Sequence, residues 1–180
     1  KISNISYKVL ESFSVFFVTL WASLLFISTI LFFAKQPLRL INLWIALIIS
    51  IVFLVYYTKQ KFKDYILITL AGVMVFIITF LPVIAISGKV YDLSYDGQAY
   101  HQEAIVQFAR GWNPVYMFLD GEATANLERW LNHYPKAGWI LSGTVFLLTG
   151  NIEHGKAMSL YILVPTLAFS FWALWKTKLS

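Results

Sequence analysis

Long apolar runs divide the chain, and the polar residues gather between them. Residues 13–34, 40–57 and 65–87 contain no charged side chain. A helix that crosses a bilayer core of ~30 Å needs about 20 apolar residues, because each residue rises ~1.5 Å. The three runs therefore predict three transmembrane helices.

Two further apolar runs, 137–150 and 157–175, follow a polar stretch over residues 88–136. The run 137–150 has only 14 residues, so it is either a full span or a re-entrant segment. The hydropathy pattern predicts an all-α fold: a polytopic α-helical membrane protein with about five transmembrane helices. Residues 88–136 would form one long external loop.

The loop has its own helical pattern. The run Gln98–Arg110 follows Asp96-Gly97 and ends at Gly111, which is the order of an N-cap, a helix and a C-terminal glycine. A second amphipathic run, Glu122–His133, has apolar residues at i, i+4, i+7 and i+8. We expect two surface helices, whose apolar sides carry Tyr100, Ala104, Ile105, Phe108 and Ala109 in the first and Ala123, Leu127, Trp130 and Leu131 in the second.

Composition supports a membrane protein. The chain is 59% hydrophobic and only 13% charged, whereas soluble domains have about 25% charged residues. Its net charge is +5, but the loop 88–136 has six acidic and four basic residues, and the excess of cations lies at the ends of the apolar runs. Cations in these places anchor helices at lipid headgroups, so no nucleic-acid partner is expected. The chain has no cysteine, which excludes disulfides and thiolate chemistry.

The cations also predict an orientation. With the loop outside, the inner segments carry Lys1, Lys8, Lys59, Lys61, Lys63 and Lys156, and the short outer segments carry Lys35, Arg39, Lys176 and Lys178. This small bias favours an extracytoplasmic loop in the cytoplasmic or inner membrane of the cell.

We expect one membrane domain over residues 1–180. It would consist of three helices in 1–87, the external loop 88–136 and two further helices in 137–180. Because the chain begins at Lys1 without a methionine, we expect it to be part of a longer protein.

The loop begins with a dense group of ionisable residues: Asp92, Asp96, His101 and Glu103. A carboxylate beside lipid is partly desolvated, which raises its basicity toward a hydroxyl proton. If the helix begins at Asp96, then Tyr100 and Glu103 share its face. On spacing alone, Asp96 is either an ordinary N-cap or a base, and Asp92 is either a base or a solvated turn residue.

Two other interpretations remain open at this point. The four ionisable residues offer oxygen and nitrogen ligands to a metal, although their spacing matches no ligand template. Lys136, in His133-Tyr134-Pro135-Lys136 before an apolar run, is either a ligand for lipid phosphate or an anchor at the membrane surface. The same two roles are open for Arg110 and Arg129.

Two motifs resemble the first external loop of the bacterial membrane glycosyltransferases of the GT-C superfamily. They are the string from Ser94 to Ala104 with Asp96-Gly97 and Tyr100-His101, and the string Arg110-Gly111-Trp112-Asn113-Pro114. The later Asn132-His133-Tyr134-Pro135-Lys136 resembles the next landmark of that family. The resemblance covers about residues 88–160 and implies that the chain is part of a larger GT-C fold.

The resemblance implies an enzyme of the cell envelope. It would transfer a sugar from a polyprenyl-phosphate donor to a hydroxyl of a saccharide, lipid or protein acceptor, with inversion, beside membrane lipid. Asp96 best matches the family's general base, with Asp92 second, and Lys136 would bind the phosphate. Tyr100, His101, Glu103, Tyr134 and Arg110 are the other expected substrate-binding residues. No cofactor or metal is expected for a lipid monophosphate donor.

Two alternatives belong to other classes of protein. A carrier or flippase for lipid-linked saccharides would place ionisable residues inside its helices, and the first three apolar runs contain none. A non-catalytic membrane assembly subunit would bind a partner through loop residues such as Trp112, Tyr116, Phe118 and Trp130.

Overall fold

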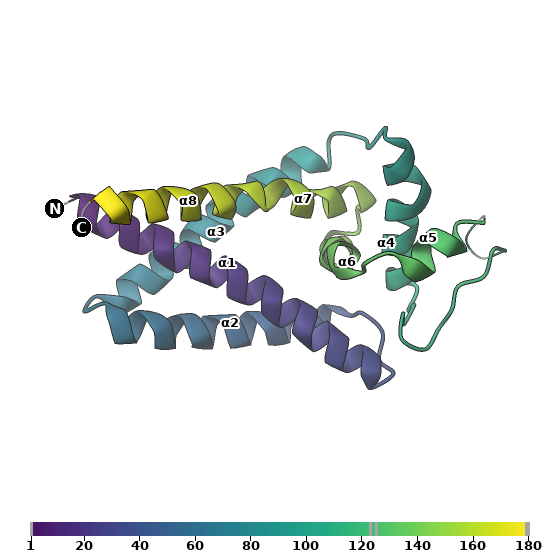
Figure 1. The fold of residues 1–180 in the computed structure, drawn as a ribbon, viewed down its shortest axis with the longest axis horizontal. Coiled ribbons are helices and arrows are strands. Elements are labelled where there is room, and N and C mark those ends of the chain that lie inside the picture. Colours follow the sequence, from purple (N-terminus) through teal and green to yellow (C-terminus); the bar gives the residue numbers. More distant parts are fainter. Residues whose placement is uncertain (1, 123, 125, 179–180) are drawn as a thin grey trace.

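Four long helices form a bundle in the computed structural model, which describes residues 2–122, 124 and 126–178. Figure 1 shows them running along the long axis of the molecule, with both termini at the same end of the bundle. They are α1 (Ile2–Phe33), α2 (Leu40–Lys61), α3 (Tyr65–Ser87) and α8 (Leu163–Lys178). The described residues contain no β-strand.

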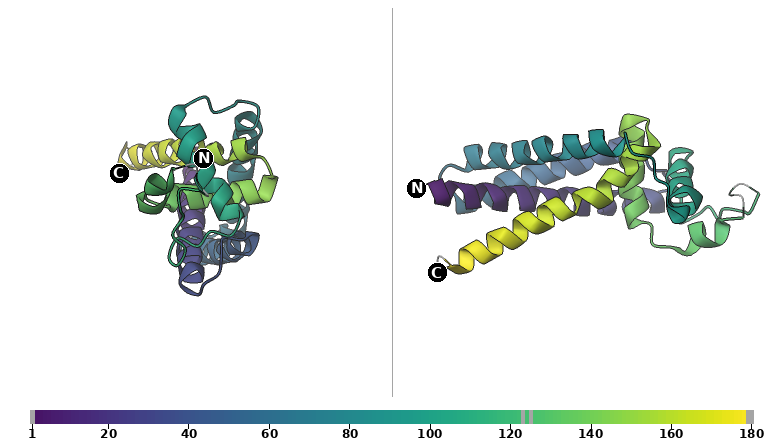
Figure 2. Two further views of the ribbon diagram at one scale, coloured as in Figure 1. Left: turned by 90° about the vertical axis from the view of Figure 1, so that its right-hand side faces the viewer. Right: turned by 90° about the horizontal axis from the view of Figure 1, so that it is seen from above.

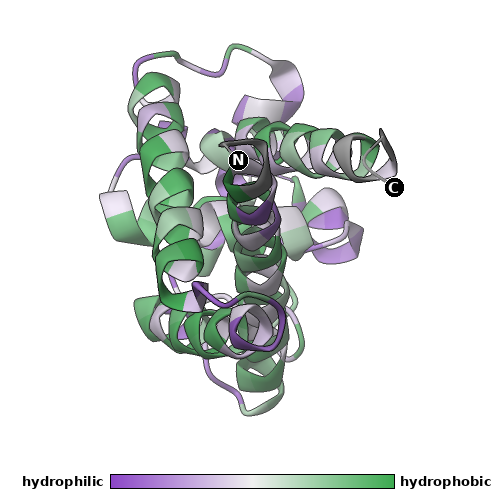
Figure 3. Cartoon of the chain, turned by 90° about the vertical axis from the view of Figure 1, so that its left-hand side faces the viewer, coloured by the Kyte–Doolittle hydropathy of each residue, from purple (hydrophilic) through white to green (hydrophobic). Residues whose placement is uncertain are grey.

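Four helical stretches are long and apolar enough to cross a membrane. They are Ile5–Phe33, Leu40–Lys61, Tyr65–Ser87 and Ile152–Leu174. Large apolar side chains point outward from them, with Ile48 64% and Ile78 62% exposed, and Figure 3 shows apolar residues covering much of these helices. An outer surface of this kind is stable in lipid and unstable in water, which agrees with the predicted α-helical membrane protein; the number of spans stays a prediction.

Small and polar side chains bring the first three helices together. Gly72 lies so close to α1 that a Cβ atom there would overlap the side chain of Ser12. Asn42 Nδ2 donates to Ser28 Oγ at 3.2 Å between α2 and α1. Helices in lipid associate through such close contacts and hydrogen bonds, because burial of apolar surface does not drive them together there.

Helix α1 begins earlier than the first apolar run. Its first turns include Glu11, which is buried and pairs with Lys61 at the end of α2. Glu11 also accepts hydrogen bonds from Tyr57 and, at 3.2 Å, from Trp172 Nε1. Helix α1 thus buries an ionisable residue, Glu11, just before the apolar run 13–34. The contacts with Lys61, Tyr57 and Trp172 give Glu11 a structural role.

The fifth predicted span, α6 (Ala137–Thr149), lies across the end of the bundle (Figures 1 and 2). Its 13 residues reach only about 20 Å as a helix, short of a bilayer core of ~30 Å. After α6 the chain forms a 3₁₀ turn, η2 (Ile152–Lys156), and then α7 (Ala157–Tyr161) leads into α8. His154, in η2, lies beside the start of the loop, because a Cβ atom on Gly88 would overlap its ring.

The first surface helix is present, but it starts at a different cap. Helical residues begin at Tyr95, pass through a π-helical turn, η1 (Gly97–His101), and continue as α4 (Gln102–Ala109). Ser94 caps this helix, since its Oγ accepts the Gly97 N–H at 3.0 Å. Asp96 is helical and makes no capping bond, so its reading as an N-cap is wrong.

The far end of this helix follows the sequence pattern. Gly111 has φ +99°, a left-handed conformation that favours glycine at a helix end. Four of the five predicted apolar-side residues are buried: Tyr100, Ala104, Ile105 and Phe108. The fifth, Ala109, is exposed.

The second surface helix is shorter than predicted. Only Glu128–His133 is helical, as α5, and the described part of 121–127 forms turns. Asn126 takes the left-handed conformation, with φ 65°, which a continuous α-helix does not allow. Leu131 is buried, Leu127 is partly buried and Trp130 is 43% exposed. Ala123 lies outside the described residues.

Asn113 ties the loop to the bundle. Its Nδ2 donates to the carbonyl oxygens of Phe32 at 2.9 Å and Gln36 at 3.3 Å, at the end of α1. Trp112 is buried beside it, with Nε1 donating to the Met117 carbonyl at 2.9 Å. Asn113 thus donates to carbonyl groups at the end of α1, and Trp112 holds the backbone of the loop that follows it.

Candidate functional site

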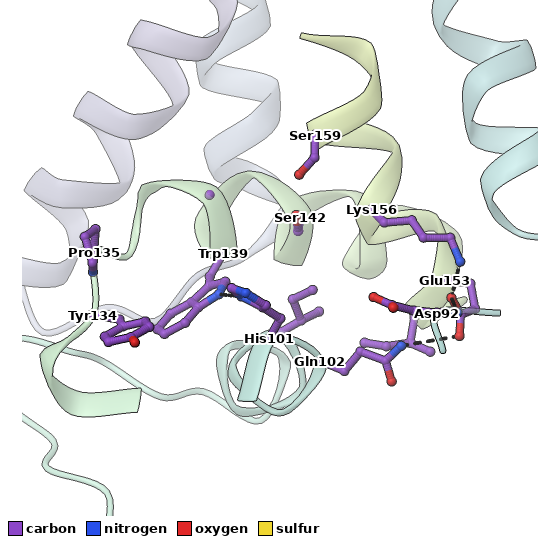
Figure 4. Close-up of a pocket in the computed structure, with 13 residues that line it drawn as sticks. Asp92, His101, Gln102, Tyr134, Pro135, Trp139, Ser142, Glu153, Lys156 and Ser159 are labelled. Atoms are coloured by element: carbon purple, nitrogen blue, oxygen red, sulfur yellow. Dashed lines mark hydrogen bonds and ion pairs between the residues drawn. The ribbon is translucent and has the colours of Figure 1, made fainter. Parts of the chain in front are cut away.

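A cavity of about 330 Å³ lies where the loop, α4, α6 and η2 meet at the end of the bundle. Figure 4 shows side chains from all these elements pointing into one space. Its polar lining residues include Asp92, His101, Gln102, Tyr134, Ser142, Glu153, Lys156 and Ser159, with Trp139 and Ile105 among the apolar ones. The cavity therefore joins residues from both ends of the loop with residues that follow α6.

Asp92 is the loop carboxylate that lines the cavity. Its Oδ1 accepts two hydrogen bonds from Ser94, from the backbone N–H at 2.9 Å and from Oγ at 2.6 Å. These bonds, above all the one from the hydroxyl, lower the pKa of Asp92, and the charge of Lys156 lowers it further. Asp92 is therefore ionised at neutral pH, and the expectation that nearby lipid raises its basicity is wrong, because the hydrogen bonds from Ser94 stabilise the charged form.

Gly97 gives the Asp92 carboxylate its place. A Cβ atom on Gly97 would overlap Asp92 Oδ2 and Ser94 Oγ. We expect Gly97→Ala to displace the carboxylate and to remove most of the activity that depends on it, measured by the transfer assay described below. The control is Gly138→Ala, in the same cavity wall, where a Cβ atom meets nothing within 4 Å. Equal activity of the two variants would contradict this placement of Asp92.

Glu153 and Lys156 form the wall opposite α4. Glu153 is buried and pairs with Lys156. It also accepts hydrogen bonds from the Asp92 N–H at 3.0 Å and from Gln102 Nε2 at 3.3 Å. Lys156 donates a second bond to the Val90 carbonyl. The prediction that Lys156 and the loop lie on opposite sides of the membrane is therefore wrong, because η2 folds back onto the loop.

His101 lines the cavity beside α6. Trp139 Nε1 donates to His101 Nδ1 at 2.7 Å, as the dashed line between them in Figure 4 shows. Tyr134, which also lines the cavity, stacks on Trp139 with ring centroids 6.4 Å apart. The structure thus brings together three predicted site residues: Asp92, His101 and Tyr134.

Asp96 and Tyr100 lie outside the cavity lining. Asp96 is exposed, whereas the Tyr100 side chain is buried. Burial of the Tyr100 phenol, its hydrogen bond to Asp96 and the charge of that carboxylate all raise the pKa of Tyr100. The side chain that best matches the family's base is thus engaged by a tyrosine beside the cavity.

Glu103 and Arg110 also lie away from the cavity lining. Glu103 Oε1 accepts a hydrogen bond from Gln107 Nε2 at 2.7 Å along α4. Arg110 is exposed at the C-terminal end of the same helix. Their expected contact with substrate stays a prediction.

Lys136 is held by its own surroundings. Its ammonium donates to the carbonyls of Asn132, at 3.0 Å, and Tyr134. It also lies over the rings of Trp112 and Trp139, 5.7 and 5.4 Å from their centroids. Desolvation lowers the pKa of Lys136. Lys136 does not line the cavity, so its expected binding of phosphate stays a prediction, and Lys156 is the lysine that lines the cavity.

A second cavity, of about 180 Å³, lies on another part of α6 and has an apolar lining. It is formed by α1, α2, α3 and the second half of α6, through residues such as Trp21, Phe80, Val145 and Leu148. The first half of α6 supplies Gly138, Trp139 and Ser142 to the polar cavity. One short helix therefore separates a polar space from a hydrocarbon-like one.

Sequence reasoning missed Glu153, Lys156, Gln102 and Trp139. The charged pair Glu153 and Lys156 lies between two apolar runs and was the available sequence signal for these residues, but such a pair is also typical of an ordinary turn between helices.

Among the described residues, no three His, Asp or Glu side chains are grouped closely enough to hold a metal ion. No protein-family model, curated protein or solved structure matches the chain.

Proposed function

We propose that the chain carries the catalytic cavity of a membrane glycosyltransferase that takes sugar from a polyprenyl-phosphate donor. The observation that carries this proposal is the placement of an ionised carboxylate, Asp92, and a cation, Lys156, in one cavity at the end of a membrane helix bundle. A lipid-linked phosphate sits at headgroup depth, and an acceptor hydroxyl comes from water, so the two meet only at such a boundary. The resemblance of the loop to the GT-C superfamily agrees with this reading.

In our proposal four helices cross the membrane and α6 does not. The end of the bundle away from the cavity then carries Lys8, Lys59, Lys61, Lys63, Lys176 and Lys178. The short connection between α1 and α2 carries only Lys35 and Arg39. Lys156, at the start of the last candidate span, adds a third cation at the cavity end, and the contrast of six against three favours a cavity on the extracytoplasmic side.

The reaction follows from the positions of the charged groups. The acceptor hydroxyl gives its proton to Asp92 while its oxygen forms a bond to the anomeric carbon from the face opposite the phosphate. The bond between that carbon and the phosphate oxygen breaks, and the electron pair stays on the phosphate. An ammonium has three N–H groups, and Lys156 uses two in the contacts above, so the third is free for the phosphate oxygen.

The apolar cavity supports a lipid-linked donor. Its lining residues on α1, α2, α3 and α6 expose only apolar surface, which suits the hydrocarbon part of a carrier lipid. Because α6 borders both cavities, a carrier bound along this helix would present its phosphate to the polar side.

Transfer of labelled sugar tests the proposal. The chain, purified in detergent and returned to lipid vesicles, is given a radiolabelled polyprenyl-phosphate sugar and a mixture of saccharide, lipid and peptide acceptors. We expect label to move to an acceptor, with inversion at the anomeric carbon. Label that moves equally in wild type and in the Asp92→Asn, Asp96→Asn double variant would contradict a carboxylate base in this loop.

The pH dependence of transfer gives an independent prediction. Asp92 must be ionised to act as a base, so activity falls as the pH drops through its lowered pKa. Ser94→Ala removes the hydroxyl that most lowers this pKa, and we therefore expect the acidic limb of the rate profile to move to higher pH. Ser94→Thr keeps a hydroxyl and should keep the wild-type limb. An acidic limb that stays in place in Ser94→Ala would exclude Asp92 as the titrating base.

A further inference from the structure

The hydrogen bond between Trp139 and His101 decides which histidine nitrogen carries the hydrogen. Trp139 Nε1 donates to His101 Nδ1 at 2.7 Å. An indole N–H is a donor only, so Nδ1 must be the acceptor and keeps its lone pair. In a neutral imidazole the single hydrogen is then on Nε2.

The surroundings hold this arrangement in place. Trp139 is buried on α6, with its ring centroid 5.9 Å from that of His101. On the other side, the Tyr100 ring centroid lies 4.5 Å from the His101 ring. The two aromatic rings and the indole N–H leave the imidazole little freedom to turn.

The second nitrogen is available to a ligand. His101 lines the polar cavity together with Asp92, Tyr134, Glu153 and Lys156. Within the described part of the chain, its Nε2 makes no hydrogen bond, and the His101 side chain is exposed to solvent. An Nε2–H group in this place can donate to an oxygen atom of a bound molecule.

We infer that Trp139 is a positioning residue that makes His101 a hydrogen-bond donor to a phosphate oxygen in the cavity. The choice of phosphate rests on the proposed function, whereas the donor state of His101 rests on the hydrogen bond alone. A donor suits this site, because Asp92 already supplies the base and the departing phosphate gains negative charge. A hydrogen bond to a charged oxygen is stronger than one between neutral groups.

Nitrogen NMR tests the donor state directly. The full chain, labelled with ¹⁵N-histidine in detergent micelles at neutral pH, should show His101 with hydrogen on Nε2 and a hydrogen-bonded, unprotonated Nδ1. His101→Gln identifies the signals by deleting them, and those of His133 and His154 serve as internal references. In Trp139→Phe, which keeps an aromatic ring, the Nδ1 signal should move to the position of a free acceptor. Hydrogen on Nδ1 in the wild-type protein would overturn the inference.

Addition of phosphate tests what the donor binds. Decyl phosphate should shift the Nε2 signal of His101 more than its Nδ1 signal, and Trp139→Phe should weaken this response at least threefold while the signals of His133 and His154 stay in place. If decyl phosphate shifts the Nε2 signal at a lower concentration than inorganic phosphate does, the ligand is a lipid phosphate. If both probes act at the same concentration, the ligand is free phosphate. An Nε2 signal that neither probe moves would overturn phosphate as the ligand.

The two proposals can fail separately. The NMR measurements need no sugar transfer, so an Nε2–H group that responds to phosphate in a protein without transferase activity would retain this inference and reject the proposed reaction. Sugar transfer by a protein in which the hydrogen is on His101 Nδ1 would reject this inference and retain the proposed reaction.

Discussion

We expect Asp92→Asn to lower the proposed rate of sugar transfer by about 10²–10⁴-fold, which is the usual contribution of a general base. The amide has nearly the shape of the carboxylate but cannot take a proton from the acceptor hydroxyl. It can still accept hydrogen bonds from Ser94, so the first turn of the helix should stay folded. Initial rates with labelled donor, measured at saturating acceptor, give the comparison.

Asp96→Asn is the matched control for this experiment. Asp96 is only four residues from Asp92 but is exposed and does not line the cavity. We expect the variant to keep most of the wild-type rate. A large loss in Asp96→Asn, together with a small one in Asp92→Asn, would move the base to the position that the family resemblance favours, and it would show that the cavity closes around Asp96 when substrate binds.

Glu153→Ala destabilises the protein by about 2–3 kcal/mol, because it leaves a partly buried ammonium without its partner. Glu153 is 8% exposed and pairs with Lys156, and two further donors, the Asp92 N–H and Gln102 Nε2, lose their acceptor as well. For a chain of this size the midpoint of thermal unfolding should fall by about 4–10 °C. Circular dichroism in detergent measures the change.

Glu103→Ala serves as the comparison for Glu153→Ala. Glu103 is partly exposed and accepts one hydrogen bond, from Gln107 on the same helix, so its loss should cost about 1 kcal/mol or less. Equal unfolding midpoints for the two variants would mean that Glu153 does not hold the cavity wall to the loop.

The spans of the first three helices could be predicted from the sequence, because their hydropathy is uniform over at least 18 residues. The end of the first surface helix was also predictable, since Gly111 has a conformation that other residues rarely adopt. Its start was not predictable, because Ser94 and Asp96 are both good caps. Only the three-dimensional structure shows that the side chain of Asp92 packs over Gly97 and hydrogen-bonds Ser94.

The cavity itself depends on contacts between distant parts of the chain. Glu153 meets the backbone of Asp92 across 61 positions of sequence, and Trp139 meets His101 across 38. No local pattern encodes such pairs. They form because α6 is too short to span and turns along the end of the bundle, which returns η2 to the loop. A fifth span would separate Glu153 from Asp92 by the thickness of a membrane, whereas Trp139, at the start of α6, would lie beside the loop with or without that span.

The transverse position of α6 also decides whether the number of membrane crossings is even or odd. With the four crossings that we propose, the start of α1 and the end of α8 face one compartment, whereas with five crossings they would face opposite compartments. Reporter proteins fused before α1 and after α8 should therefore give the same compartment signal, and a reporter inserted into the turn near Gly121 should give the opposite one. Accessibility of three tagged sites thus reveals how the polypeptide threads the bilayer, without any knowledge of its substrate.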